Sequence, residues 1–227
     1  MEVKYRIGYI DEDKSQVKLY KRKLREYGFE VMGYEFRKGM SLDELMHQVY
    51  NSNIDLLMID YKLNESNIIP FNGDKVEKHI YENKPLFPHI IFTNKVDQAE
   101  PEVDDLKIII DKESVFSSDE KDNSKSSRFV ELLSKSIEQY KNLITKKKNL
   151  IADLLEKERT QELNAKENDL LLSTQRELQS LDKGRLKAIP EQLTSMEILG
   201  KLSDVRQEAE AYIESLLAQD DLDESKN

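Results

Sequence analysis

DLLMID, residues 55–60, places four apolar residues directly before a single aspartate, Asp60. A run this short and this apolar is typical of a buried strand in a parallel sheet. Because an ionised carboxyl group is costly to remove from water without partners, Asp60 is unexpected at the end of such a strand. It either ends the strand by capping the next turn or takes part in chemistry.

Four further apolar runs share the first 115 residues with this one, at 4–10, 30–36, 89–93 and 107–111. Between them, residues 14–27, 41–51 and 73–84 show helical spacing, and Gly28 follows the first of these where a helix commonly ends. Strands that alternate with helices predict an α/β fold with a doubly wound five-stranded parallel sheet. The residues between 93 and 112 are few and include Pro101, so we expect the helix there to be short.

From about residue 117 the pattern becomes helical. Residues 128–181 contain neither proline nor glycine, and apolar residues recur at coiled-coil-like spacing at Leu133, Ile137, Tyr140, Ile144, Ile151 and Leu154. The spacing fails through EKERTQELNAKEND and returns in a new register, and Lys183-Gly184 and Pro190 indicate a turn before a further helix at 191–218. We therefore predict three parts: a domain at 1–122, a long helical hairpin or coiled coil at 123–218, and a disordered acidic tail at 219–227. Pairing within one chain and pairing between two chains are both compatible with this pattern.

Composition excludes several classes of function. Asp and Glu outnumber Lys and Arg by 45 to 35, which argues against nucleic acid or an anionic membrane as the main partner. Cysteine is absent, so disulfides, thiol nucleophiles and thiolate metal sites are excluded. No segment has the roughly 18 consecutive apolar residues of a transmembrane helix, and we expect a cytoplasmic protein.

Charged and hydroxyl side chains follow the predicted strands. In a parallel sheet the carboxyl ends of the strands meet at one edge, where ligands bind. That edge would carry Asp11-Glu12-Asp13, Asp60, Thr93 and Lys112. Neighbouring carboxylates repel one another, and a divalent cation such as Mg²⁺ relieves that repulsion. The set suits phosphoryl transfer to Asp60. Each member alone also has an ordinary explanation: Asp60 could cap a turn, Asp11-Glu12-Asp13 could cap a helix, Thr93 could be a strand residue and Lys112 a solvated loop lysine.

The chain resembles the receiver (CheY-like) domain of bacterial response regulators over about residues 4–116. The resemblance rests on YIDEDKSQVKLYKRKLREYGFEV, LLMIDYKL, IIFTN and IIIDK, in that order. It implies that Asp60 accepts a phosphoryl group from a histidine kinase, with Thr93 and Lys112 beside it. It also implies that Mg²⁺ is held by Asp11, Glu12, Asp60 and the backbone carbonyl of Lys62.

Four positions depart from the family pattern. Glu12 stands where many receivers have aspartate, Asn94 where the residue is small, Ile109 where the family has its switch aromatic, and Glu113 where proline is usual. These departures favour an alternative, a pseudo-receiver that is not phosphorylated and acts as a scaffold through its helices. A metal-dependent phosphohydrolase would need a second acid at position 62, which is Lys62.

The function predicted from the sequence is therefore a signalling receiver that accepts phosphate at Asp60 and relays its state through a helical module. We expect that module to bind a protein partner and to form a homodimer. We expect no enzymatic activity beyond phosphorylation and dephosphorylation of its own aspartate.

Overall fold

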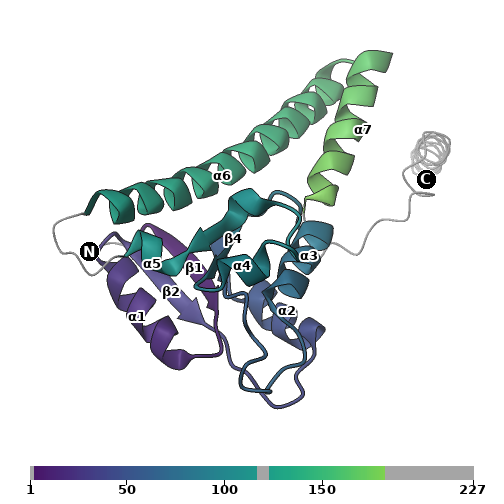
Figure 1. The fold of residues 1–227 in the computed structure, drawn as a ribbon. Helices are drawn as coiled ribbons and strands as arrows, with labels where there is room; N and C mark the ends of the chain where they lie inside the picture. Colours follow the sequence, from purple (N-terminus) through teal and green to yellow (C-terminus); the bar gives the residue numbers. More distant parts are fainter. Residues whose placement is uncertain (1–2, 117–122, 182–227) are drawn as a thin grey trace, which may run out of the picture. The chain divides into compact units, whose positions relative to one another are not determined.

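A five-stranded parallel sheet forms the centre of the computed structural model, which describes residues 3–116 and 123–181 (Figure 1). The strand order is β2-β1-β3-β4-β5, and neighbouring strands pair in parallel. This is a doubly wound α/β sheet of the flavodoxin-like type. The fold class and all five predicted strands are confirmed. Their bounds are β1 (Tyr5–Ile10), β2 (Phe29–Gly33), β3 (Leu56–Ile59), β4 (His89–Thr93) and β5 (Ile109–Asp111).

Helices cover both faces of the sheet. One face packs against α1 (Lys14–Arg25) and the first half of α6 (Asn123–Thr160). The other face packs against α2 (Leu42–Asn51), α3 (Gly73–Asn83) and the single turn α4 (Val96–Ala99). All four residues of β3 are buried, which explains why its sequence is an uninterrupted apolar run rather than an alternating one.

Local signals in the sequence set the helix ends. The Asp13 side chain accepts a hydrogen bond from the Ser15 amide and begins α1, and Ser41 and Glu44 form a reciprocal capping box at the start of α2. After α1 the chain turns at Gly28, whose φ of 83° lies in the left-handed region that glycine adopts most readily. The glycine predicted to follow the first helix is therefore placed where the backbone requires one.

The connection between β4 and β5 contains little regular structure. Besides the four residues of α4, it holds a 3₁₀ turn at Leu106–Ile108, and β5 is followed directly by the single turn α5 (Lys112–Val115). The short helix expected between Thr93 and Lys112 is confirmed.

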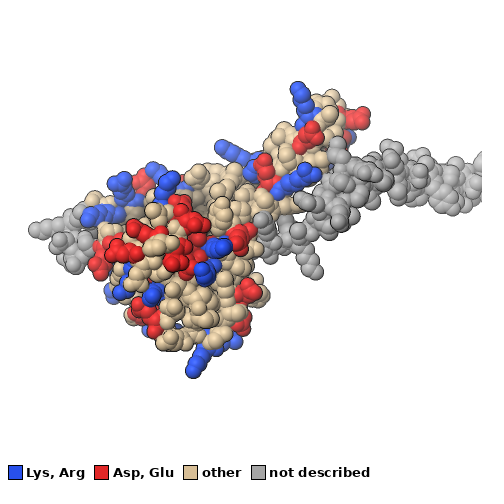
Figure 2. Space-filling view, turned by 45° about the vertical axis from the view of Figure 1, so that its right-hand side comes forward, with Lys and Arg blue, Asp and Glu red and all other residues tan. Residues whose placement is uncertain are grey.

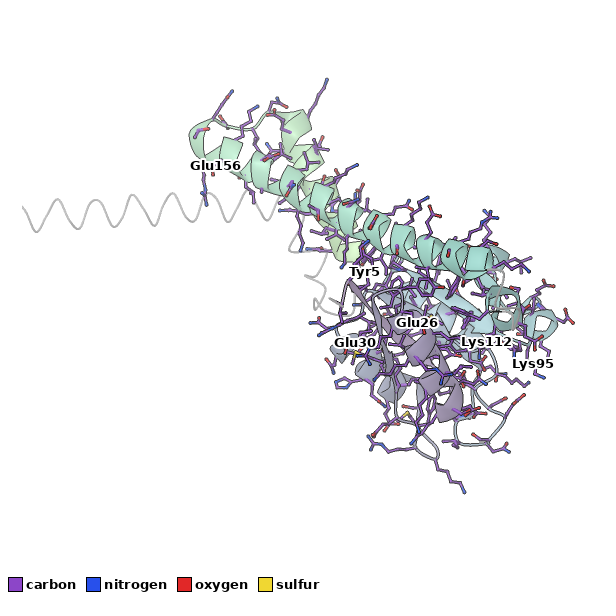
Figure 3. The ribbon with its side chains drawn as sticks, turned by 90° about the vertical axis from the view of Figure 1, so that its left-hand side faces the viewer. Tyr5, Glu26, Glu30, Lys95, Lys112 and Glu156 are labelled. Atoms are coloured by element: carbon purple, nitrogen blue, oxygen red, sulfur yellow. The ribbon has the colours of Figure 1, made fainter. Side chains whose placement is uncertain are left out.

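The long helix α6 belongs to the sheet core over its first half. Phe129, Leu133 and Ile137 are buried on the face that also contains α1. The Tyr5 hydroxyl donates a hydrogen bond of 2.7 Å to Glu138 on α6, and Figure 3 shows Tyr5 beneath that helix. Lys141 forms an ion pair of 2.7 Å with Asp55. With 38 residues, α6 is about 57 Å long, so it extends well past the sheet.

The second half of α6 packs against α7 (Ala165–Ser180) as an antiparallel hairpin (Figure 1). Lys157 pairs with Glu167 at 2.5 Å, and Lys147 pairs with Glu177 further from the turn. The chain reverses at residues 161–164, inside the stretch where the apolar spacing fails. Asn164 then begins α7 through a capping box with Glu167. The predicted turn at Lys183-Gly184 and Pro190, the helix at 191–218 and the tail at 219–227 lie outside the described residues.

Candidate functional site

Four of the predicted site residues lie together at the carboxyl edge of the sheet. Asp11 and Asp60 directly follow β1 and β3, Thr93 ends β4, and Lys112 directly follows β5. All four are buried. The Lys112 ammonium group donates to Asp11 Oδ2 at 2.9 Å and to Asp60 Oδ1 at 2.8 Å. One cation therefore bridges the two carboxylates and offsets their mutual repulsion.

The environment of Asp60 disfavours its charged form. Burial raises the pKa of this carboxyl group above its ordinary value, and the nearby charge of Asp11 acts in the same direction. The charge of Lys112 and hydrogen bonds from Lys112 and Thr93 oppose that rise but do not cancel it. The second oxygen of Asp60 accepts a hydrogen bond of 3.1 Å from the Lys62 amide. Asp60 is thus a desolvated carboxylate held by fixed donors.

Asp11 accepts hydrogen bonds from Tyr9 and Asp13 as well as from Lys112. The hydroxyl group of Tyr9 donates to Asp11 Oδ2 at 2.5 Å, and the Asp13 amide donates to Asp11 Oδ1 at 2.9 Å. Burial raises the pKa of Tyr9 far above its ordinary range, so this phenol remains protonated and acts as a donor. Both oxygens of Asp11 therefore have a donor from the chain.

Glu12 contacts a loop residue, Ser66, whereas Asp11 and Asp60 contact Lys112. Glu12 accepts hydrogen bonds from the amide of Ser66 at 3.1 Å and from its hydroxyl at 2.5 Å. Within residues 3–116 and 123–181, no three His, Cys, Asp or Glu side chains gather closely enough to hold a metal ion. Asp11 and Asp60 still fit Mg²⁺, since this ion commonly takes one or two carboxylates and completes its shell with water. The predicted magnesium site remains a prediction, and in the described residues Glu12 contacts Ser66 and is not gathered with Asp11 and Asp60.

The positions that depart from the family pattern lie around this edge. Asn94 and Glu113 are exposed. The side-chain oxygen of Thr93 accepts a hydrogen bond of 3.1 Å from the Lys95 amide, which leaves its O–H free to donate toward Asp60. Ile109 is partly buried on the sheet face that carries α2 and α3, opposite the face that α6 covers.

Three residues that contact the site did not stand out in the sequence. Tyr9 is hidden in the apolar run of β1, and Ser66 lies in a polar loop without a motif. Gly73 begins α3 where a Cβ atom would collide with the backbone carbonyl of Asp60. The available signals were a hydroxyl group two residues before Asp11 and a glycine at the start of a helix.

An acidic segment lies close to the site in the chain. Five exposed acids fall between β4 and β5, at Asp97, Glu100, Glu102, Asp104 and Asp105. Figure 2 shows Asp and Glu side chains gathered on one face of the α/β part of the molecule. A surface of this charge repels anionic partners and agrees with the net charge of −10.

Comparisons with known proteins give resemblance at the level of structure alone. No family model and no curated protein matches the sequence. The receiver domain of response regulator 1452 from Francisella is 17% identical, with a TM-score of 0.41, and the match covers 60% of this chain and 98% of that one. The response regulator TrrA from Thermotoga maritima, solved with Mg²⁺-BeF, is 20% identical, with a TM-score of 0.39 and coverage of 59% and 99%. The non-phosphorylated HemR receiver domain from Leptospira biflexa is 18% identical, with a TM-score of 0.42 and coverage of 59% and 94%.

No helix within the described ranges is long and apolar enough to cross a membrane. The sheet of this chain has the strand order β2-β1-β3-β4-β5 and is covered by helices on both faces. In its fold, this chain is a doubly wound α/β protein with a five-stranded parallel sheet and a long helical extension.

Proposed function

We propose that this chain is a signalling receiver that accepts a phosphoryl group on Asp60. The observation that carries the proposal is the shared contact of Asp11 and Asp60 with the Lys112 ammonium group, from three different strand ends. An arrangement that served only to end strands would not require a buried lysine between two buried carboxylates. A constellation of this kind is typical of a site that handles oxyanions.

The proposed reaction uses Asp60 as the nucleophile. A carboxylate oxygen of Asp60 attacks the phosphorus atom of a donor, the bond from phosphorus to the leaving group breaks, and the electron pair departs with that group. Lys112 and Thr93 supply a positive charge and a hydroxyl donor for the incoming oxygens. Mg²⁺, held by Asp11, Asp60 and the Lys62 carbonyl, would neutralise charge on the transferred group.

The resemblance implies a histidine kinase as the donor, and the helices are the proposed output. Because the first half of α6 is part of the sheet core, a change in that core reaches the hairpin without crossing a flexible linker. We propose that the helical module contacts a protein partner and that the chain acts in the cytoplasm.

Phosphorylation of the intact chain tests the proposal. The full-length protein is incubated with Mg²⁺ and a small-molecule acyl phosphate, and its mass is measured before and after treatment with hydroxylamine, which cleaves acyl phosphates. We expect wild type to gain one hydroxylamine-sensitive phosphoryl group and Asp60→Asn to gain none. The matched control is Asp111→Asn, which removes an acid at the end of β5 and should be phosphorylated like wild type.

An unmodified wild-type chain, or equal modification of Asp60→Asn, would contradict the proposal. That result would favour the second candidate, an unphosphorylated scaffold. A specific observation supports that candidate: both oxygens of Asp11 and both of Asp60 already accept hydrogen bonds from the chain. Beryllofluoride with Mg²⁺ offers a second test, since NMR amide signals near Asp60 and Thr93 should shift in wild type but not in Asp60→Asn.

We also propose a homodimer, formed by surfaces other than the predicted apolar seam. Leu133 and Ile137 of that seam are buried against the sheet, and Leu154 is buried against α7. Leu155 and Leu170 on the hairpin are 41% and 43% exposed and remain available to a second copy. Light scattering should give a dimer for the intact chain and a monomer for the double variant Leu155→Gln, Leu170→Gln. A monomeric wild-type chain would contradict this part of the proposal.

A further inference from the structure

Tyr9 connects the acidic site to the interior of the protein. It lies in β1 with no exposed surface, and its hydroxyl donates to the same oxygen of Asp11 that Lys112 contacts. A buried phenol requires a partner, and here that partner is a charged residue of the proposed site. If the acceptor on Asp11 changes, the Tyr9 hydroxyl has to find another partner or remain unpaired.

The ring of Tyr9 belongs to an aromatic cluster that extends to α6. Its centroid lies 6.2 Å from that of Phe92 and 5.8 Å from that of Tyr20. Phe92 in turn stacks on Phe129 of α6, with centroids 5.4 Å apart and ring planes at 16°. Phe92 and Tyr9 have no exposed surface, and Phe129 is 5% exposed. Two ring contacts therefore separate the residue that holds Asp11 from the long helix.

Close packing allows such a cluster to transmit a displacement, since interiors contain few voids that could absorb it. On β5, Ile109 packs toward α2 and α3, whereas Ile110 and the Phe116 ring that follows α5 pack on the α6 side, with the Phe116 centroid 5.9 Å from that of Phe129. The cluster of Tyr9, Phe92 and Phe129 is thus a packed route from Asp11 to α6, beside the one that α5 provides from Lys112.

We propose that Tyr9 is a positioning residue that couples Asp11 to the packing of α6. Its hydroxyl fixes the Asp11 carboxylate, and its ring passes any change of that contact to Phe92 and Phe129. The inference deepens the proposed function by naming how the site would reach the helices. It concerns residues of the chain alone, so it can be tested without a metal ion or a phosphodonor.

A double-mutant cycle on the full-length chain measures the coupling. Amide hydrogen exchange is followed in α6 at residues 126–137, with α2 as the reference helix on the opposite face. In a chain that retains Tyr9, Asp11→Ala should accelerate exchange in α6 about tenfold, because it leaves a buried donor without its charged acceptor. In a Tyr9→Phe background the same change should alter α6 exchange by less than about twofold, because the buried phenol hydroxyl is then absent and Lys112 keeps Asp60 as its acceptor.

Two variants separate this contact from a general structural effect. Asp11→Asn keeps an acceptor for the Tyr9 hydroxyl and should restore α6 exchange toward the wild-type rate. Tyr20→Phe removes a phenol hydroxyl from the same cluster without touching Asp11 and should leave the effect of Asp11→Ala intact. If Asp11→Ala does not fold, Tyr9→Phe alone is compared with Tyr20→Phe, and only Tyr9→Phe should change α6 exchange.

Equal effects of Asp11→Ala with and without the Tyr9→Phe substitution would overturn the inference, as would a change that appears equally in α2. Failure of the phosphorylation test leaves this result unaffected, because no phosphoryl group is used. Conversely, an uncoupled Tyr9 would leave Asp60 as the proposed acceptor and remove only the route to α6.

Discussion

The two halves of α6 form one continuous helix but belong to different cores. The first half buries Phe129, Leu133 and Ile137 against a sheet and α1. The second half buries Leu154 against a single neighbouring helix, α7, in a cluster whose other buried members are Leu163 and Leu171. The same apolar spacing therefore contributes to a large core in the first half and to a small core in the second. This predicts that the first half of α6 is stable and that the α6–α7 hairpin opens more easily.

The largest effect is expected at the base of α6. Leu133 has no exposed surface, so Leu133→Ala leaves a cavity in the sheet core and should lower the free energy of unfolding by about 3 kcal/mol. Chemical denaturation followed by circular dichroism measures the loss. A loss below about 1 kcal/mol would mean that this half of α6 does not share the sheet core.

A smaller and more local effect is expected at the hairpin. Leu154 is 8% exposed and contacts a cluster of few residues, so Leu154→Ala should cost about 2 kcal/mol. Because α7 contacts only α6 in this cluster, the loss should appear as faster amide exchange in α7, with the melting of the α/β part unchanged. Loss of the whole fold in a single transition would make the two halves one cooperative unit.

Sequence patterns predicted the sheet more completely than the helices that follow it. The strands, and the edge at which their carboxyl ends meet, followed from apolar runs that stop at Asp60 and Thr93, because burial on both faces gives uninterrupted apolar runs that a sequence displays directly. The seam of α6 was equally visible, but its partner was not, since a coiled coil, a sheet and a second helix all require the same spacing. The reversal at residues 161–164 contains neither glycine nor proline. Its only local signal is the capping box of Asn164 and Glu167.

In the site, too, the sequence predicted which residues are present but not which of them are in contact. Asp11 and Glu12 are adjacent acids with identical expected roles, yet one is buried on Lys112 and the other accepts hydrogen bonds from Ser66. Successive residues at a strand end point in different directions, so composition predicts the charge of the edge but not which carboxylates meet. The contact of Tyr9 with Asp11 was hidden for a related reason, because a tyrosine within an apolar strand is indistinguishable from a core aromatic until its hydroxyl has a partner.

A third prediction concerns the site beside the first half of α6. Asp60→Asn should raise the free energy of unfolding at neutral pH by about 1 kcal/mol, because it removes a desolvated charge while Lys112 keeps Asp11. Burial raises the pKa of Asp60 above 3.8, so as the pH rises the unfolded chain loses its proton before the folded chain does. The free-energy penalty of burying the Asp60 charge is therefore absent from wild type below pH 3.8. It grows as the pH rises through the pKa that Asp60 has in the folded chain, and it is constant above that pKa.

Thermal melting of wild type and Asp60→Asn from acid to neutral pH measures this difference. The difference in melting temperature between Asp60→Asn and wild type should grow as the pH rises. A gap that closes as the pH rises would mean that Lys112 stabilises the charged form of Asp60 by more than burial disfavours it.

The smallest effect is expected from the ion pairs, and it completes the comparison of the two halves. Lys141 ties the first half to Asp55, and Lys147 ties the second half to Glu177, with side chains 51% and 20% exposed on the lysine side. Because one side chain of each pair is more than half exposed, Lys141 at 51% and Glu177 at 59%, both pairs are screened by water and salt. Lys141→Met and Lys147→Met should therefore each cost about 0.5 kcal/mol, and less as salt is raised. The two should differ only in where the loss appears. Lys141→Met should lower the midpoint of global unfolding, whereas Lys147→Met should accelerate amide exchange in α7 alone, because a contact contributes to whichever unit opens when it breaks.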